Sequence, residues 1–187
     1  MISIIDYKAG NLTSVKLALD ALGAESTVTS DPDAILAAER VVFPGVGAAK
    51  SAMDNLRALG LEDVVRRCAA EKPFLGICLG MQILFDRSEE DGGTSTLGLI
   101  PGEVRHFPSL PGFKVPQIGW NQVNGDKEYY FVHSYYAEIC PFTTGVTEYA
   151  GVRFTAMIKK DRLWACQFHP EKSGRTGLEL MREWLEA

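Results

Sequence analysis

The sequence predicts an α/β fold: a doubly wound, mostly parallel central sheet with helices on both faces, and an antiparallel extension in the second half. In the first half, short apolar segments alternate with amphipathic ones, as parallel strands alternate with crossover helices. After residue 86 this alternation gives way to strand-like segments separated by turns. The length of 187 residues and the apolar fraction of 46% favour a single domain over 1–187.

The first half predicts four strands and three helices. We expect strands at 1–7, 25–30, 40–43 and 73–78, and helices at 10–23, 31–39 and 49–71. The first helix has apolar residues at helical spacing and stops at Gly23, a residue favoured after helix C-termini. The second starts with Asp31 as the expected N-cap and Pro32 in its first turn.

The second half predicts strands and one closing helix. A polar, glycine-rich loop at 89–98 comes first. We expect strands within 114–123, 129–138, 143–149 and 154–170, with a hairpin turn around Lys160 and Asp161. The last segment, 173–187, is expected to form a helix with Leu178, Met181, Trp184 and Leu185 on one face.

Charge, hydropathy and cysteine usage disfavour several classes of protein. The net charge is −5 and no basic run exceeds the pair Arg66 and Arg67, so we expect no nucleic-acid partner. No apolar stretch reaches the roughly 18 residues of a membrane span, and the N-terminal segment lacks the features of a secretory signal. Together with four widely spaced cysteines, this predicts a cytoplasmic protein with free thiols.

Cys78, in the stretch "GICLG", is the candidate nucleophile. It lies where an apolar strand meets a helix-like pattern, and the carboxyl ends of parallel strands are where functional groups gather. Glycines two residues before and after it allow a tight strand-to-helix turn, as in the G-x-S-x-G nucleophile elbow. The following helix N-terminus favours a thiolate. The alternative is a small buried hydrophobic residue, the usual role of a free cysteine.

A cysteine nucleophile requires a base, and the chain has three histidines, His106, His133 and His169. His169 precedes Pro170, which favours an extended backbone at 169. If Pro170 is extended as well, Glu171 points to the same side and can orient the imidazole. "HPE" is therefore the expected base and its orienting carboxylate, and the alternative is a surface turn. We expect only a structural role for His106.

The stretch "PGVG" at 44–47 ends a strand, and glycines there permit outward-pointing N–H groups. It lacks the Gly-Lys of a P-loop and the third glycine of the dinucleotide fingerprint, so an oxyanion hole is favoured over a phosphate site, and the alternative is a plain glycine-rich loop. Its two donors would be the N–H groups of Leu79 and Gly47.

A metal site is disfavoured by the spacing of its candidate ligands. Cys166 and His169 lie three apart in a strand and point to opposite faces, and no second pair completes a zinc site. We therefore expect no metal and no cofactor, and we expect Cys68, Cys140 and Cys166 to be packing residues.

Taken together, "GICLGMQ", "PGVG" and "QFHPEKS" resemble the class I, triad-type glutamine amidotransferases, and stretches such as "IIDYKAGNL" and "VPQIGWNQV" extend the resemblance over nearly the whole chain. The resemblance implies that Cys78 attacks the side-chain amide of L-glutamine, that His169 transfers protons and that Glu171 holds His169. It also implies substrate contacts from Gly45, Gln82, His133, Ser134 and Tyr135, although His133 alone would be taken for a core residue.

The resemblance implies a partner as well: a cyclase with a (β/α)₈ barrel, joined in a heterodimer and supplied with ammonia. Trp120, Asn121 and Lys172 are expected near that interface, with ordinary core packing as the alternative for Trp120. The family pattern has glycine, an aromatic residue and histidine where this chain has Lys8, Ala49 and Gln117. A sister amidotransferase that serves another synthase, and a non-catalytic scaffold, remain as alternatives.

Overall fold

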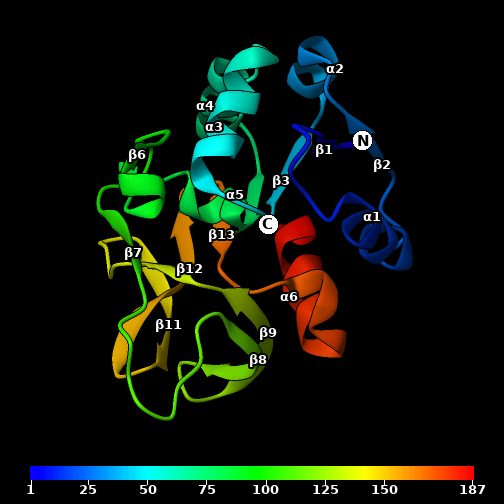
Figure 1. Ribbon diagram of the computed structural model, residues 1–187. Coiled ribbons are helices and arrows are strands. Elements are labelled where there is room, and N and C mark those ends of the chain that lie inside the picture. The colour runs from blue at the N-terminus through cyan, green and yellow to red at the C-terminus, as the bar shows by residue number, and fades with distance from the viewer.

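The structure, a computed structural model, describes residues 1–187 and is built on one large sheet. Its strand order is β2-β1-β3-β4-β13-β12-β10-β7-β5-β6, with β11 paired to β12. The strands of the first half are β1 (Ile2–Ile5), β2 (Ser26–Thr29), β3 (Arg40–Gly45) and β4 (Phe74–Cys78), and all of them pair in parallel. The predicted doubly wound parallel sheet is confirmed (Figure 1).

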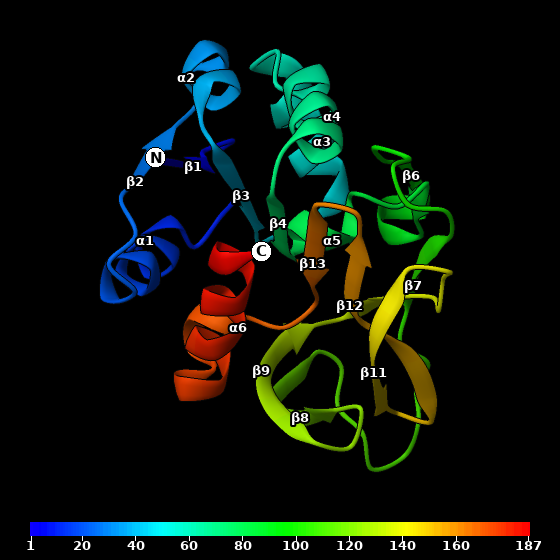
Figure 2. The same cartoon turned by 180° about the vertical axis from the view of Figure 1, so that it is seen from behind.

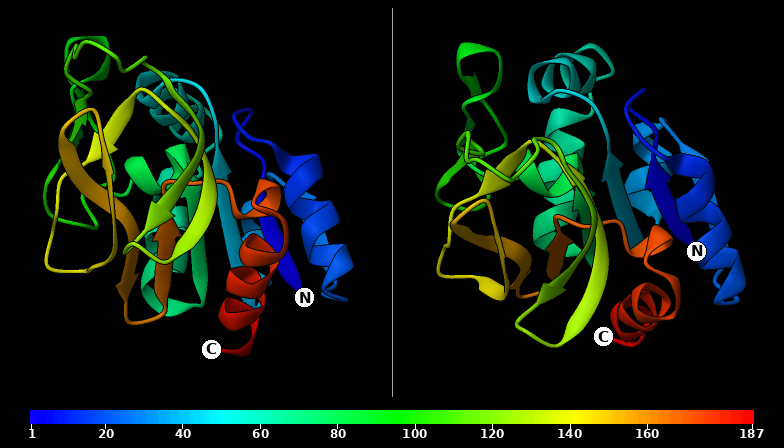
Figure 3. Two further views of the ribbon diagram at one scale, coloured as in Figure 1. Left: turned by 90° about the horizontal axis from the view of Figure 1, so that it is seen from below. Right: turned by 60° about the horizontal axis from the view of Figure 1, so that its bottom comes forward.

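Helices cover both faces of this parallel sheet. The helices are α1 (Leu12–Ala21), α2 (Pro32–Ala37), α3 (Ala49–Ala58), α4 (Glu62–Glu71), α5 (Leu79–Gln82) and α6 (Gly174–Glu186). Alternate strand residues serve two cores: Val41 and Phe43 pack with α2, α3 and α4, whereas Val42 packs with α1 and α6. Figure 3 shows α6, in red, beside the blue N-terminal segment.

The second half supplies the antiparallel extension. Its strands are β5 (Arg87–Ser88), β6 (Thr94–Ser95), β7 (Glu103–His106), β8 (Gln117–Val123), β9 (Lys127–His133), β10 (Tyr135–Ala137), β11 (Thr143–Tyr149), β12 (Val152–Lys160) and β13 (Leu163–Cys166), with short 3₁₀ turns η1 (Glu90–Gly92) and η2 (Pro170–Lys172). The predicted hairpin is β12–β13, and β13 pairs in parallel with β4 (Figure 2). The β8–β9 hairpin forms a separate two-stranded sheet.

Two predicted elements are wrong in detail. The segment 49–71 is not one helix, because it breaks between α3 and α4, where Gly60 has a φ of +67°. The segment 129–138 is two strands rather than one, because β9 pairs with β8 whereas β10 pairs with β7 and β12. The amphipathic and apolar patterns run across both breaks, so periodicity does not reveal them.

Gly80 explains one glycine of the "GICLG" stretch. A Cβ at this position would lie 1.9 Å from the backbone oxygen of Phe43, so α5 approaches β3 more closely than any side chain permits. We expect Gly80→Ala to lower the free energy of unfolding by about 3 kcal/mol, the cost of overpacking against backbone. Chemical denaturation measures this change.

Gly60→Ala is the matched control for that substitution. A Cβ at Gly60 meets nothing within 4 Å, so only its positive φ is penalised, at about 1 kcal/mol. Equal losses in the two variants would show that close packing at Gly80 is not the reason for its glycine.

Candidate active site

Cys78 lies at the tip of a strained strand-to-helix turn. It ends β4 and caps α5, with φ 54° and ψ −112°, a conformation rare for a residue with a side chain. Its register partner on β3 is Gly45, so the carboxyl ends of both strands meet at this edge. The arrangement matches the nucleophile elbow that the sequence predicts.

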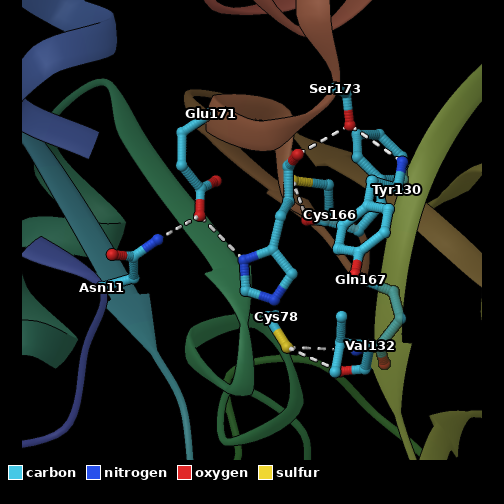
Figure 4. A network of polar contacts seen from close by, with 10 residues as sticks. Asn11, Cys78, Tyr130, Val132, Cys166, Gln167, Glu171 and Ser173 are labelled. Atoms are coloured by element: carbon cyan, nitrogen blue, oxygen red, sulfur yellow. Dashed lines mark hydrogen bonds and ion pairs between the residues drawn. The ribbon is translucent and has the colours of Figure 1, made fainter. Parts of the chain in front are cut away.

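His169 and Glu171 lie together beside this turn. Nδ1 of His169 donates to Oε1 of Glu171 across 2.8 Å, and both side chains are almost wholly buried. Nε2 of the ring is then free to face Cys78, and both residues line the same cavity. Figure 4 shows Glu171 and Cys78 on opposite sides of the ring to which the dashed line from Glu171 runs.

Glu171 reaches the imidazole by a route that differs from the expected one. His169 is extended, as its position before proline predicts, but Pro170 starts the 3₁₀ turn η2 instead of continuing the strand. The N–H of Lys172 donates to the carbonyl of His169 across 3.0 Å, and this turn brings Glu171 back over the ring. Proline has a fixed φ suited to a first helical turn, so it favours the turn over extension.

The electrostatics of His169 follow from its two neighbours. Burial alone lowers the pKa of His169, but its hydrogen bonds and charge interactions with Cys78 and Glu171 outweigh burial and raise that pKa to about 10. Both neighbours therefore favour the protonated form of the His169 imidazole.

The backbone of His169 is fixed on both sides. Its N–H donates to the carbonyl of Tyr130 across 2.9 Å, and its carbonyl accepts from the Ser173 hydroxyl across 2.6 Å. Ser173 in turn accepts from the N–H of Tyr130 across 2.9 Å, which closes a small network visible in Figure 4. Strand β9 therefore holds the imidazole in place.

A cavity of about 340 Å³ opens at this edge of the sheet. Its walls contain Cys78 and His169, the predicted oxyanion donors Gly47 and Leu79, the predicted substrate contacts Gln82, His133, Ser134 and Tyr135, and also Val46, Glu90, Pro116, Val132 and Lys172. Gly47 has a φ of +97°, and the N–H of Leu79 belongs to the first turn of α5, where no intrahelical acceptor exists.

Gly45 is absent from these walls, unlike the other predicted substrate contacts. It is buried in β3, and a Cβ there would lie 2.3 Å from the hydroxyl of Tyr7 and 2.8 Å from the backbone nitrogen of Gly80. Its lack of a side chain serves the close packing under the nucleophile turn.

His133 is held by the protein itself. Its Nδ1 lies 2.8 Å from the carbonyl of Tyr135 and its Nε2 lies 2.8 Å from the amide of Gln117. Burial lowers the pKa of His133 to about 4, so the ring is neutral. Both nitrogens are engaged, which leaves the backbone of this segment, rather than the imidazole, to face a ligand.

The three departures from the family pattern lie near the site without entering the triad. Lys8 has a φ of 63°, in the left-handed region that glycine adopts without steric cost. Ala49 starts α3, and its N–H donates to Glu90 across 2.6 Å. Gln117 is buried against His133.

Three residues with no role in the sequence analysis also lie at the site. Glu90 supplies the only carboxylate on the cavity wall. Asn11 donates its side-chain N–H to Oε1 of Glu171 across 3.4 Å, and Gln167 donates to the sulfur of Cys78 across 3.7 Å. The position of Gln167 could have been predicted from the sequence, because in a strand it shares a face with His169.

All four cysteines are free thiols, and no three side chains of the metal-ligating types cluster together. None of the helices is long and apolar enough to span a bilayer.

The chain belongs to the class I glutamine amidotransferase family, whose family model, "Glutamine amidotransferase class-I", matches residues 3–186. Solved structures agree on the fold. A "Crystal structure of glutamine amidotransferase" has a TM-score of 0.75 at 21% identity and covers 99% of this chain and 97% of its own. PurLQS from Thermotoga maritima has a TM-score of 0.68 at 16% identity, with coverage of 99% and 97%.

Curated relatives point to one branch of this family. "Imidazole glycerol phosphate synthase subunit HisH" from Methylococcus capsulatus is 48% identical over 206 residues, which cover 98% of this chain and 95% of the relative. The protein of the same name from Acinetobacter baylyi is 44% identical over 200 residues, with coverage of 99% and 97%.

Proposed function

We propose that this chain is the glutaminase subunit of an imidazole glycerol phosphate synthase, acting in L-histidine biosynthesis in the cytoplasm. It hydrolyses L-glutamine to L-glutamate and ammonia and passes the ammonia to a cyclase subunit. The observation that carries the proposal is the strained Cys78 turn facing an imidazole that a buried carboxylate holds. The full-length similarity to HisH proteins supports the choice of branch.

In the first step, the thiolate of Cys78 attacks the side-chain amide carbon of glutamine. The carbonyl electrons move to oxygen, which accepts hydrogen bonds from the N–H groups of Leu79 and Gly47. His169, protonated and steadied by Glu171, then donates its proton to the leaving nitrogen. The carbon–nitrogen bond breaks, and ammonia and a γ-glutamyl thioester result.

In the second step, water hydrolyses the thioester. His169, now neutral, takes a proton from the attacking water, and the same two N–H groups stabilise the second oxyanion. The carbon–sulfur bond breaks, glutamate leaves, and the proton on His169 restores the imidazolium–thiolate pair. The carboxylate of Glu171 keeps the ring in one orientation through both transfers.

The cavity wall carries charges opposite to those of the α-ammonium and α-carboxylate groups of glutamine. Glu90 is the only carboxylate there, so we assign it the α-ammonium group. Lys172 and the backbone N–H groups of Ser134 and Tyr135 face the α-carboxylate. Gln82 already donates to Tyr135 across 2.8 Å, which leaves its carbonyl oxygen as an acceptor for the substrate amide.

Glu90→Gln is expected to raise KM for glutamine about 10- to 100-fold with a smaller change in kcat, since a half-buried charged contact is lost. Burial raises the pKa of Glu90, so kcat/KM of the native protein should fall as pH drops through that pKa and the carboxylate is neutralised. In Glu90→Gln, kcat/KM should not fall over this acidic pH range. Steady-state kinetics across pH measure both effects.

Glu89→Gln is the matched control for that prediction. The neighbouring carboxylate contacts Arg105 and the N–H of His106 at the surface, away from the cavity. Its removal should change KM less than about twofold, because exposed ion pairs contribute little. A KM in Glu90→Gln no higher than in this control would contradict the assigned role.

Ammonia released into water would be protonated and lost, so the reaction is useful only beside an acceptor site. We propose that the acceptor is a (β/α)₈-barrel cyclase bound as a heterodimer, which makes imidazole glycerol phosphate and aminoimidazole carboxamide ribotide. Strand β8, beside the cavity, exposes Ile118 at 65% and Trp120 at 56%, an apolar surface suited to a partner. Asn121 and Lys172, also expected near the interface, do not extend this apolar surface: the Asn121 side chain donates to the carbonyl of Glu148 across 2.9 Å, and Lys172 lies on the cavity wall.

The test measures glutamate release and the fate of the amide nitrogen. The purified chain is assayed with ¹⁵N-amide glutamine, alone and with a cyclase subunit and its substrate. We expect ¹⁵N in the imidazole product even when an ammonia scavenger is present. Transfer to a chorismate-using synthase instead, as for anthranilate or aminodeoxychorismate, would assign the chain to a sister enzyme, and no hydrolysis with any partner would indicate a non-catalytic scaffold.

A further inference from the structure

Gln167 is a buried polar residue beside the nucleophile that the triad does not use. It follows directly on β13, where Cys166 pairs with Ile77 of β4, so the next residue along lies beside Cys78. Its side chain is 0% exposed. Its amide nitrogen, Nε2, lies 3.7 Å from the sulfur of Cys78 (Figure 4).

A chain of hydrogen bonds fixes the orientation of this amide. The carbonyl of Tyr135 can only accept, so the group of Gln82 that lies 2.8 Å from it is the NH₂ group. The second proton of that NH₂ group donates to Oε1 of Gln167 across 2.9 Å. The NH₂ group of Gln167 must then face Cys78, which places a donor at the sulfur.

The sulfur therefore has partners for both of its protonation states. As a thiol, it donates to the carbonyl of Val132 at 3.8 Å. As a thiolate, it cannot donate, and it accepts from Gln167, while the charge of protonated His169 also favours it. A hydrogen bond to an ion is roughly twice as strong as one between neutral groups, so the Gln167 contact favours the reactive form.

We propose that Gln167 is a positioning residue for the glutaminase reaction, one that holds the sulfur of Cys78 against His169 and favours its thiolate, with Gln82 fixing the Gln167 amide. The inference rests on the proposed function for its biological meaning. Its geometry concerns the sulfur alone and is tested without glutamine. Gln82 thereby has a second role besides facing the substrate, because it connects the cavity wall to the nucleophile.

The test is the pH dependence of Cys78 alkylation by iodoacetamide, followed by mass spectrometry of the peptide that contains Cys78. Gln167→Met keeps the length of the side chain but removes the donor. We expect the midpoint of the alkylation curve to rise by roughly one pH unit, and the rate at neutral pH to fall up to about tenfold. The other titratable groups facing the sulfur, His169, Tyr7 and Cys166, are unchanged in this variant.

Cys166→Ala is the matched control. It also removes a buried polar group from the same strand end, but its thiol donates to the carbonyl of Phe168 rather than to Cys78. Its alkylation midpoint should shift far less than in Gln167→Met, because this thiol makes no hydrogen bond to the Cys78 sulfur. Equal midpoints in the native protein and Gln167→Met, with both folded by near-ultraviolet circular dichroism, would overturn the proposal.

A second measurement needs no substitution at 167. In the native protein, the side-chain ¹⁵NH₂ resonance of Gln167 should shift with pH at the midpoint of Cys78 alkylation, and a resonance that does not move would overturn the proposal. Both readouts are independent of turnover. If the chain hydrolyses no glutamine but the midpoint shifts, the proposed function fails, and the stabilisation of the Cys78 thiolate by Gln167 stands.

Discussion

Replacement of Cys78 by Ser lowers the glutaminase kcat by about 10⁴-fold or more, because loss of a nucleophile removes most of the acceleration that a triad supplies. The hydroxyl that replaces the thiol is far less acidic, so the imidazolium–thiolate pair cannot form. Glutamate release, measured with the partner present, reports this loss. Circular dichroism and binding of the partner should remain native, since serine fits the same buried site.

Cys140→Ser is the control for that substitution. Cys140 is a half-buried thiol outside the cavity and contacts Thr143. It should keep native kcat and KM within about twofold, as surface substitutions usually do. Native turnover in Cys78→Ser would end the proposed mechanism, and equal losses in both variants would point to a general effect of thiol loss.

Glu171→Gln is expected to lower kcat by about 10³- to 10⁴-fold while KM changes little. The carboxylate accepts the proton-bearing Nδ1 of His169 across 2.8 Å, and an amide in its place can present a donor and favour the wrong tautomer. The negative charge that raises the pKa of His169 is lost as well. In Glu171→Gln, the pH dependence of kcat should therefore change as well as the value of kcat.

Asn11→Ala separates that charge effect from orientation. Asn11 donates to the same oxygen of Glu171, and the second oxygen, Oε2, is buried without a partner. Because the charge and the bond to His169 both remain, the loss in kcat should be far smaller than in Glu171→Gln. A native kcat in Glu171→Gln would contradict the orienting role.

The parallel half of the fold follows closely from local sequence patterns. Alternating strands and helices, Asp31 and Pro32 at the start of α2, and a glycine turn at Cys78 all correspond to the structure. The insertion of β13 beside β4 could not be predicted, because strand order in a mixed sheet depends on contacts far apart in the sequence. The break at Gly60 was hidden because the apolar pattern continues through it.

The core of the candidate site was predictable because its chemistry is local. "GICLG" and "HPE" each carry a turn and a reactive group within five residues, and the structure brings Cys78, His169 and Glu171 together. Glu90 could not be found, since only the folded chain places its polar loop against the start of α3. The neutrality of His133 likewise depends on its burial against Gln117, a residue on another strand.

The most direct measurement is acid-quench mass spectrometry during glutamine turnover. The account predicts a γ-glutamyl adduct on the peptide that contains Cys78, appearing on mixing and decaying as glutamate is released. The adduct should be absent from the matching peptide of Cys78→Ser. Steady glutamate release with no adduct on Cys78, or with native rates after Cys78 has been alkylated, would contradict the account.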